Sequence, residues 1–215
     1  CIRDRCYAEA EAGKNFDKQL KAIEERYNEI IKGLGLKLSL KEQFETIRKN
    51  FEAKAGTDYA ASRGEYLNGI IMANYLGYEF IDAASVICFD ANGEFDGEKT
   101  NKVMGDRLAN VESAVIPGFY GAMPNGAVKT FSRGGSDVTG SIVARAIKAD
   151  VYENWTDVSG FLAADPRIVD NPRPIDIITY KELRELSYMG ATVLHESAIF
   201  LSLIHISEPT RPRLI

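Results

Sequence analysis

The first helix is predicted from apolar residues that recur at three- and four-residue steps between residues 16 and 34. This spacing is typical of an amphipathic helix with one buried face. Gly33 and Gly35 mark its end. The apolar positions are Phe16, Leu20, Ile23, Tyr27, Ile30 and Leu34.

Two further helices are predicted before residue 78. Ser39 is followed three residues later by Glu42, which is a capping-box pattern at a helix start. Gly56 closes this second helix. The third begins near residues 57–58 and ends at Gly77.

The pattern beyond residue 77 changes to shorter apolar runs separated by polar, glycine-containing stretches, which is typical of strands. These runs are EFIDAASVICF, SAVIPGFYG and VKTF. A helix is predicted from Ser136 to about Ala149, then a strand and loop in VYENWTDVSG, then a helix capped by Thr179 with Glu182. Strands that alternate with helices indicate an α/β fold with a mainly parallel sheet.

Composition narrows the classes of function. The 215 residues are 45% hydrophobic and 27% charged, with a net charge of −5 and a pI near 5.2, so no general attraction for nucleic acid or an anionic membrane is expected. No run approaches the roughly 20 apolar residues of a membrane span, and the cytoplasm is the expected location. Three cysteines and two histidines have no metal-site or disulfide pattern.

Both ends of the chain resemble translated sequencing adapter. The residues 1–5, CIRDR, can be encoded by TGTATAAGAGACAG plus one base, and LSLIHISEPTR in 201–215 can be encoded by the reverse complement followed by the next adapter segment. The alternative is a natural apolar strand with a basic, proline-containing tail. We therefore expect residues 6–200 to be the natural part, cut short on both sides, and exclude both ends from reasoning about the fold.

The segment FSRGGSDVTGSIVARAIKAD at residues 131–150 predicts an anion site. A short apolar strand ends in Arg133, and Gly134 and Gly135 allow a tight backbone path. Ser136 and Asp137 then open a helix. Amides at a helix N-terminus attract negative charge, and a guanidinium can hold a carboxylate through two parallel hydrogen bonds. The alternative is an ordinary N-cap beside a surface arginine.

A second motif, WTDVSGFLAADPRIV, occupies residues 155–169. Thr156 and Asp157 follow a predicted strand, at the edge where doubly wound sheets bind ligands, and Arg167 comes shortly after. Strand ends are also ordinary turn sites, so this motif alone carries less information.

Together and in this order, the two motifs resemble those of the amino-acid kinase family and, within it, the aspartate kinases. SRGEYLNG and SYMGATVLHESAI extend the resemblance over nearly all of residues 6–200. It implies a three-layer sandwich with a largely parallel central sheet. It also implies ATP-dependent phosphorylation of L-aspartate to 4-phospho-L-aspartate, the first step towards lysine, threonine and methionine, with Mg²⁺ and a homo-oligomeric full-length protein.

The resemblance also implies the roles of single residues. Arg133 matches the arginine that binds the α-carboxylate of aspartate, and Glu65 of SRGE matches a glutamate expected at its ammonium group. The loop and helix start around the same substrate match Gly134, Gly135, Ser136 and Asp137. The nucleotide site matches Thr156, Asp157 and Arg167. The alternatives are a solvated helix residue for Glu65 and a salt-bridged loop arginine for Arg167.

Three departures from the family pattern bear on activity. Thr192 stands where many relatives have a nucleotide-binding lysine, and Leu162 stands where they have a tyrosine. The family's Lys-x-Gly-Gly loop does not occur in this sequence. Phosphoryl transfer depends on positioning and on neutralising phosphate charge, so we expect this chain alone to be inactive.

Two other functions stay open. The same fold could use another acceptor, such as glutamate, carbamate or a nucleoside monophosphate, although one cation with one anion suits a zwitterionic amino acid. Alternatively, the chain could be a non-catalytic domain that binds an amino acid or a nucleotide.

Overall fold

The computed structural model describes residues 2–132, 134–155, 162–164, 168–175, 177–179, 181–182 and 185, without the side chains of residues 2–4. Contacts within the chain define two compact units, and the boundary between them in the sequence falls between Phe131 and Ser132. Each unit is described by itself. The adapter-like residues 201–215 lie outside the described residues.

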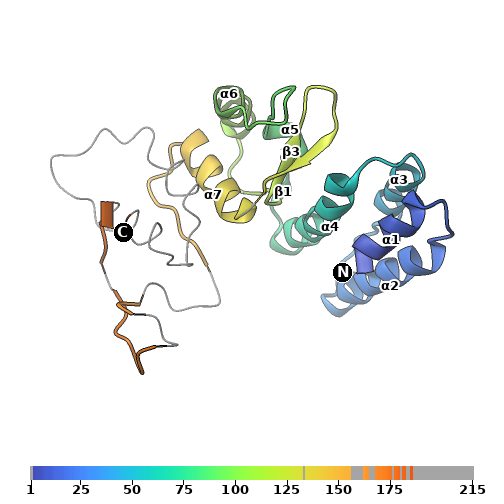
Figure 1. The fold of residues 1–215 in the computed structure, drawn as a ribbon, viewed down its shortest axis with the longest axis horizontal. Coiled ribbons are helices and arrows are strands. Elements are labelled where there is room, and N and C mark those ends of the chain that lie inside the picture. Colours follow the sequence, from blue (N-terminus) through green and yellow to red (C-terminus); the bar gives the residue numbers. More distant parts are fainter. Residues whose placement is uncertain are drawn as a thin grey trace. The chain divides into compact units, whose positions relative to one another are not determined.

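The first unit opens with helices (Figure 1). Their bounds are α1 (Ile2–Glu11), α2 (Asp17–Gly33), α3 (Lys41–Glu52) and α4 (Thr57–Leu76). Apolar residues from all four form one buried core, in which the rings of Tyr7 and Phe51 meet edge to face with centroids 5.2 Å apart. The buried residues of α2 are Leu20, Ile23 and Ile31, so the amphipathic pattern is confirmed at Leu20 and Ile23. It is wrong at Leu34, which is 42% exposed just after the helix ends.

The capping predicted for the second helix is wrong. α3 begins at Lys41, and its N-cap is Leu40, without a side-chain cap. Ser39 lies one residue earlier, where its hydroxyl accepts a long 3.4 Å hydrogen bond from the Lys41 amide. The serine therefore forms a short turn ahead of the helix. The bounds predicted for α4 are confirmed, with Gly77 in a left-handed conformation at its end.

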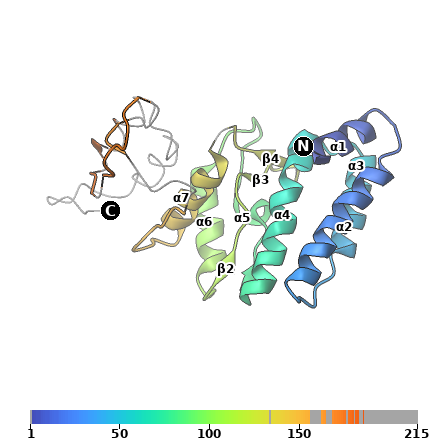
Figure 2. The same cartoon turned by 90° about the horizontal axis from the view of Figure 1, so that it is seen from below.

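The strands follow α4 (Figure 2). β1 (Glu79–Phe80) pairs in parallel with β2 (Ala114–Val115), and β3 (Tyr120–Ala122) pairs in antiparallel with β4 (Val128–Thr130). Cys88 adds a parallel bridge to Ala122. Helix α4 lies between the helices α1 and α3 and the strands, with contacts to β1, β2 and β4. The α/β class is confirmed in these residues.

The approach of the chain at residue 88 to β3 is close enough to require glycine. A Cβ atom at Gly121 would lie 2.5 Å from the carbonyl oxygen of Ile87. That carbonyl also accepts the Ala122 amide at 2.9 Å. Gly121 therefore allows the backbone pairing that aligns β3 with the preceding segment.

Two helices were missed by the strand pattern. α5 (Ala83–Val86) lies inside the run read as a strand, and α6 (Gly97–Leu108) follows it. Asp82 caps α5 by accepting from the Ala84 amide at 3.0 Å, and Asp96 caps α6 by accepting from the Lys99 amide at 3.0 Å. Aspartate before an apolar stretch is a recognised helix start, and this signal was available in the sequence.

The second unit contains α7 (Gly135–Ala146). The reciprocal capping box predicted at Thr179 is present: the Thr179 amide donates to Glu182 at 2.9 Å, and the Glu182 amide donates to the Thr179 hydroxyl at 3.3 Å. The strand predicted from residue 151 is not formed over residues 151–155. Trp155 there is 88% exposed, so this stretch lacks the packing that stabilises a strand.

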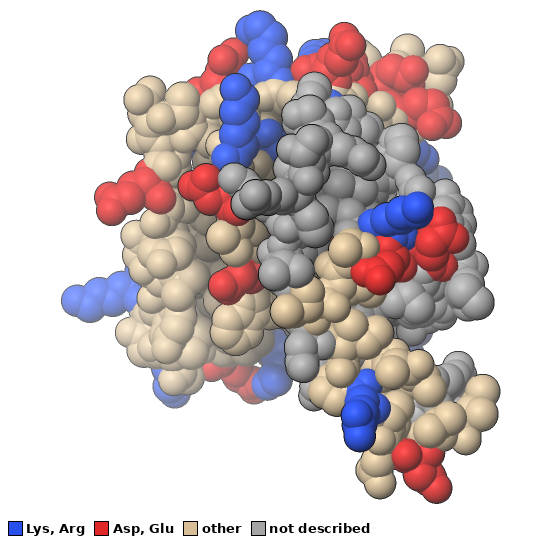
Figure 3. Space-filling view, turned by 90° about the vertical axis from the view of Figure 1, so that its left-hand side faces the viewer, with Lys and Arg blue, Asp and Glu red and all other residues tan. Residues whose placement is uncertain are grey.

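Within the described residues, no helix is long and apolar enough to cross a bilayer. The same residues contain no group of three or more histidine, cysteine or acidic side chains arranged to hold a metal ion. On the described surface in Figure 3, acidic and basic side chains lie among one another.

Candidate substrate-binding site

The start of α7 is built by a glycine in a left-handed conformation. Gly134 is the N-cap, with φ of 56° and ψ of 23° and no side-chain cap, and its carbonyl accepts the Val138 amide at 2.9 Å. A side chain at Gly134 would be strained there. The first N–H groups of a helix have no carbonyl partners within the helix. They can therefore donate to an anion, which makes this turn a favourable place for one.

The predicted residues of this turn differ in exposure. Gly135 is buried, Ser136 is exposed and Asp137 is half-buried. The hydroxyl of Thr139 donates to the Gly135 carbonyl at 2.8 Å, which fixes the turn from inside the helix. Four predicted substrate residues, Gly134 to Asp137, therefore meet at one helix start.

Tyr152 is a neighbour of this turn that the sequence patterns did not indicate. A Cβ atom on Gly140 would lie 2.5 Å from the Tyr152 hydroxyl oxygen, so the phenol rests directly on α7. Burial and the negative charge of Asp137 raise the pKa of Tyr152. The phenol therefore stays protonated near the candidate site at neutral pH.

Glu65 lies in the other unit, in the middle of α4, with an exposed side chain. Its neighbour Arg63 is buried, with 7% of its surface exposed. Residues two apart on a helix face in different directions, so the motif SRGE presents Glu65 to the surface and Arg63 to the interior.

Arg63 is held among three aromatic rings. Its guanidinium carbon lies 4.5 Å from the ring centroids of Tyr59 and Tyr66 and 5.4 Å from that of Tyr120. Nε and Nη2 donate to the hydroxyl of Ser62 at 3.1 and 2.9 Å. Cation–π contacts of this kind stabilise a desolvated arginine, so Arg63 holds α4 against Tyr120 of β3.

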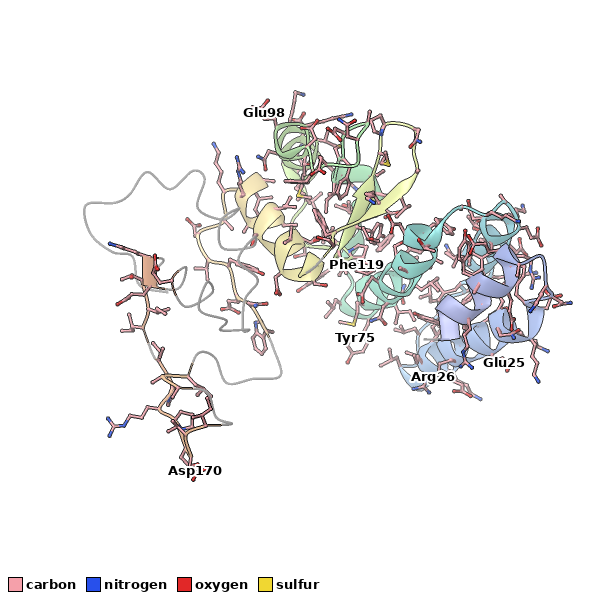
Figure 4. All side chains as sticks on the ribbon, viewed as in Figure 1. Glu25, Arg26, Tyr75, Glu98, Phe119 and Asp170 are labelled. Carbon is pink, nitrogen blue, oxygen red and sulfur yellow. The ribbon has the colours of Figure 1, made fainter. Side chains whose placement is uncertain are left out.

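Phe119 is a second residue that sequence reasoning missed (Figure 4). It has a φ of 65°, which is an outlier for a bulky residue without glycine's freedom. Its carbonyl accepts the Phe131 amide at 2.9 Å, next to the end of β4. Strained backbone of this kind gathers at functional sites, but no sequence pattern indicates it.

The amino acid kinase family matches this sequence over residues 8–203. The chain belongs to the amino acid kinase family. This match confirms the fold class that the sequence motifs predicted.

Relatives within the amino acid kinase family include aspartate kinases. Aspartokinase 3 of Bacillus subtilis is 39% identical over 150 residues, which cover 66% of this chain and 33% of that protein. The crystal structure of Clostridium acetobutylicum aspartate kinase is 57% identical, with a TM-score of 0.87, and the match covers 94% of this chain and 46% of that one. This chain thus spans about a third of the curated relative.

A third relative is known with ligands. E. coli aspartokinase III, solved in complex with aspartate and ADP, is 28% identical with a TM-score of 0.75, over 94% of this chain and 50% of that chain. The two solved structures share the fold of this amino acid kinase chain.

Four predicted site residues lie outside the described residues: Arg133, Thr156, Asp157 and Arg167. Thr192, which departs from the family pattern, lies outside them too. Their roles stay predictions. Leu162, by contrast, is described, in an isolated antiparallel bridge with Pro174. The Ala163 amide donates to the Arg173 carbonyl at 2.9 Å beside this bridge.

Proposed function

We propose that the full-length protein transfers the γ-phosphate of ATP to the side-chain carboxylate of L-aspartate. The observation that carries this proposal is the 57% identity to an aspartate kinase over 94% of the chain, at a TM-score of 0.87. The complex of E. coli aspartokinase III with aspartate and ADP supports the same pair of substrates. The product, 4-phospho-L-aspartate, would enter lysine, threonine and methionine synthesis.

Aspartate binds through opposite charges at its two ends in this proposal. Arg133 holds the α-carboxylate through two parallel hydrogen bonds, and Glu65 pairs with the ammonium group. The Gly134-capped start of α7 supports the proposal, because free amides at a helix start favour an anionic ligand. Ser136 and Asp137 complete this side of the pocket.

ATP binds through Thr156, Asp157 and Arg167 in the same proposal, with Asp157 near the base and ribose and Arg167 towards the phosphates. Mg²⁺ accompanies the nucleotide, because phosphoryl transfer requires neutralisation of the developing charge on phosphate oxygens. The cytoplasmic location, the homo-oligomeric state and the division into residues 1–5, 6–200 and 201–215 stay predictions.

The 215-residue sequence lacks the Lys-x-Gly-Gly loop that the family resemblance implies, and we propose that this chain alone has only background activity. Loss of one preorganised charge-stabilising donor lowers the rate about a hundred- to a thousandfold, and this loop supplies several. Comparing turnover by the 215-residue chain with turnover by the natural full-length protein tests this point.

The experiment that tests the function measures ADP release by the natural full-length protein with ATP and Mg²⁺. Aspartate, glutamate, carbamate and a nucleoside monophosphate are compared as acceptors, and hydroxylamine traps the acyl phosphate as a hydroxamate. We expect turnover with aspartate and with none of the other three acceptors. Turnover with another acceptor identifies a different kinase of this fold, and binding without turnover favours a non-catalytic domain.

Two variants test the assigned roles. Arg133→Ala should weaken aspartate binding by about 2–4 kcal/mol, with ATP binding nearly unchanged, because a buried carboxylate loses its bidentate partner. Glu65→Gln should also weaken aspartate binding. Matched controls on α2 are Arg26→Ala and Glu25→Gln, which remove only exposed side chains. Equal losses for both ligands would show that Arg133 is structural.

A further inference from the structure

Asp58 joins the first turn of α4 to the end of β4, 72 residues away in the sequence. Its carboxylate accepts the hydroxyl of Thr130 at 2.9 Å and, more weakly, the Thr130 amide at 3.4 Å. The ammonium group of Lys129 lies 3.3 Å from the same carboxylate. One side chain therefore receives three donors from a single strand.

The two joined elements lead to the proposed substrate groups. Glu65 lies seven residues after Asp58 on the same helix, which is about 10 Å along the axis. Arg133 follows Thr130 by three residues along the chain. Asp58 thus acts where the segment leading to Arg133 leaves the first unit.

The other side of this strand end is also fixed. Thr130 is paired with Tyr120 in the β3–β4 register, and the Phe131 amide donates to the Phe119 carbonyl at 2.9 Å. Residues 130–131 are therefore held by β3 on one side and by Asp58 on the other. Loss of the Asp58 contacts would leave the strand end fixed on one side only.

The side chain of Asp58 does not cap its own helix. The N-cap of α4 is Gly56, which has no side-chain cap and whose amide donates to the hydroxyl of Tyr7 at 2.8 Å. A carboxylate in the first turn is favoured by the helix dipole, and here its oxygens are directed to β4. With 32% of the side chain exposed, the ion pair with Lys129 contributes little, so the charge-assisted bond from Thr130 dominates.

We propose that Asp58 is a positioning residue that fixes the end of β4, from which the chain continues to Arg133, relative to the first turn of α4. This inference rests on the proposed function, because the groups that Asp58 positions are those assigned to aspartate binding. Small displacements of such groups are costly.

The test uses the natural full-length protein and the variants Asp58→Ala and Thr130→Val. Each should raise the KM for aspartate about tenfold, with the KM for ATP and kcat changed less than about twofold. The double variant should be no worse than the more severe single one, because both remove the same hydrogen bond. Thr130→Ser keeps the hydroxyl and should restore the wild-type KM.

Asp106→Ala is the matched control, because it removes a carboxylate from an exposed ion pair with Lys102 on α6. Melting temperatures are measured for every variant. A lowered melting temperature with an unchanged KM for aspartate, or equal changes in both KM values, would overturn the inference and leave a structural role only. Wild-type protein that does not phosphorylate aspartate would overturn the proposed function itself, and with it this inference.

Discussion

The hydroxyl of Tyr120 donates a 2.7 Å hydrogen bond to the carboxylate of Asp82, the residue that caps α5. Tyr120 is completely buried and is the first residue of β3, so this bond joins the start of that strand to the start of a helix. The guanidinium carbon of Arg63 lies 5.4 Å from the centroid of the same ring. Asp82, Tyr120 and Arg63 thus form one polar network, which includes a residue of α4, the helix that carries Glu65.

Tyr120→Phe should lower the free energy of unfolding by about 1–2 kcal/mol, because a buried hydrogen bond to a charged acceptor is lost. Chemical denaturation of both proteins measures this difference. Tyr75→Phe is the matched control, since Tyr75 near the end of α4 is 56% exposed and its hydroxyl can bond water (Figure 4). Equal effects of the two substitutions would contradict a special role for the Tyr120 bond.

Alkaline pH should destabilise the protein through Tyr120. Burial and the negative charge of Asp82 raise the pKa of Tyr120 far above its ordinary value of 10.0. Above pH 10 the unfolded chain loses this phenolic proton while the folded chain keeps it. The stabilisation is therefore complete below pH 10 and falls by about 1.4 kcal/mol per pH unit above it.

The comparison that isolates this group is the unfolding free energy of wild-type protein and Tyr120→Phe between pH 9 and pH 11. The variant should lose less stability per pH unit than the wild type. Tyr59 and Tyr66 also have pKa values raised by burial, so both proteins retain some alkaline dependence. Parallel curves would show that Tyr120 titrates normally.

Arg63→Lys should cost about 2 kcal/mol of stability although the charge is kept. The planar guanidinium stacks on three rings and donates twice to Ser62, whereas an ammonium group is compact and strongly hydrated. The same substitution at exposed Arg26 should change stability by less than about 0.5 kcal/mol. Thermal unfolding of both variants decides whether the ring contacts or the charge matters.

Gly134→Ala should lower stability by about 1 kcal/mol, because its φ of 56° is unfavourable for any residue with a Cβ atom. Gly33→Ala supplies the control. Gly33 is the last residue of α2 and has open space where a Cβ would lie, so alanine should be neutral or stabilising there. A neutral effect at Gly134 would mean that α7 starts with a different backbone conformation.

Local patterns determined much of this protein. The start and end of α4 and the reciprocal bonds between Thr179 and Glu182 depend on residues within one or two helical turns. They could therefore be predicted from the local sequence. The family followed from motifs for the same reason, because Glu65 and the segment from Gly134 to Asp137 are identified by their immediate neighbours. The start of α3 was misread, since Ser39 had a competing turn.

Only the tertiary structure decided which distant residues meet. Nothing near Asp58 in the sequence indicates Thr130, and nothing near Arg63 indicates Tyr120, because each pair is joined by the packing of α4 against strands far along the chain. The left-handed Phe119 is likewise imposed by its neighbours rather than by its own preference.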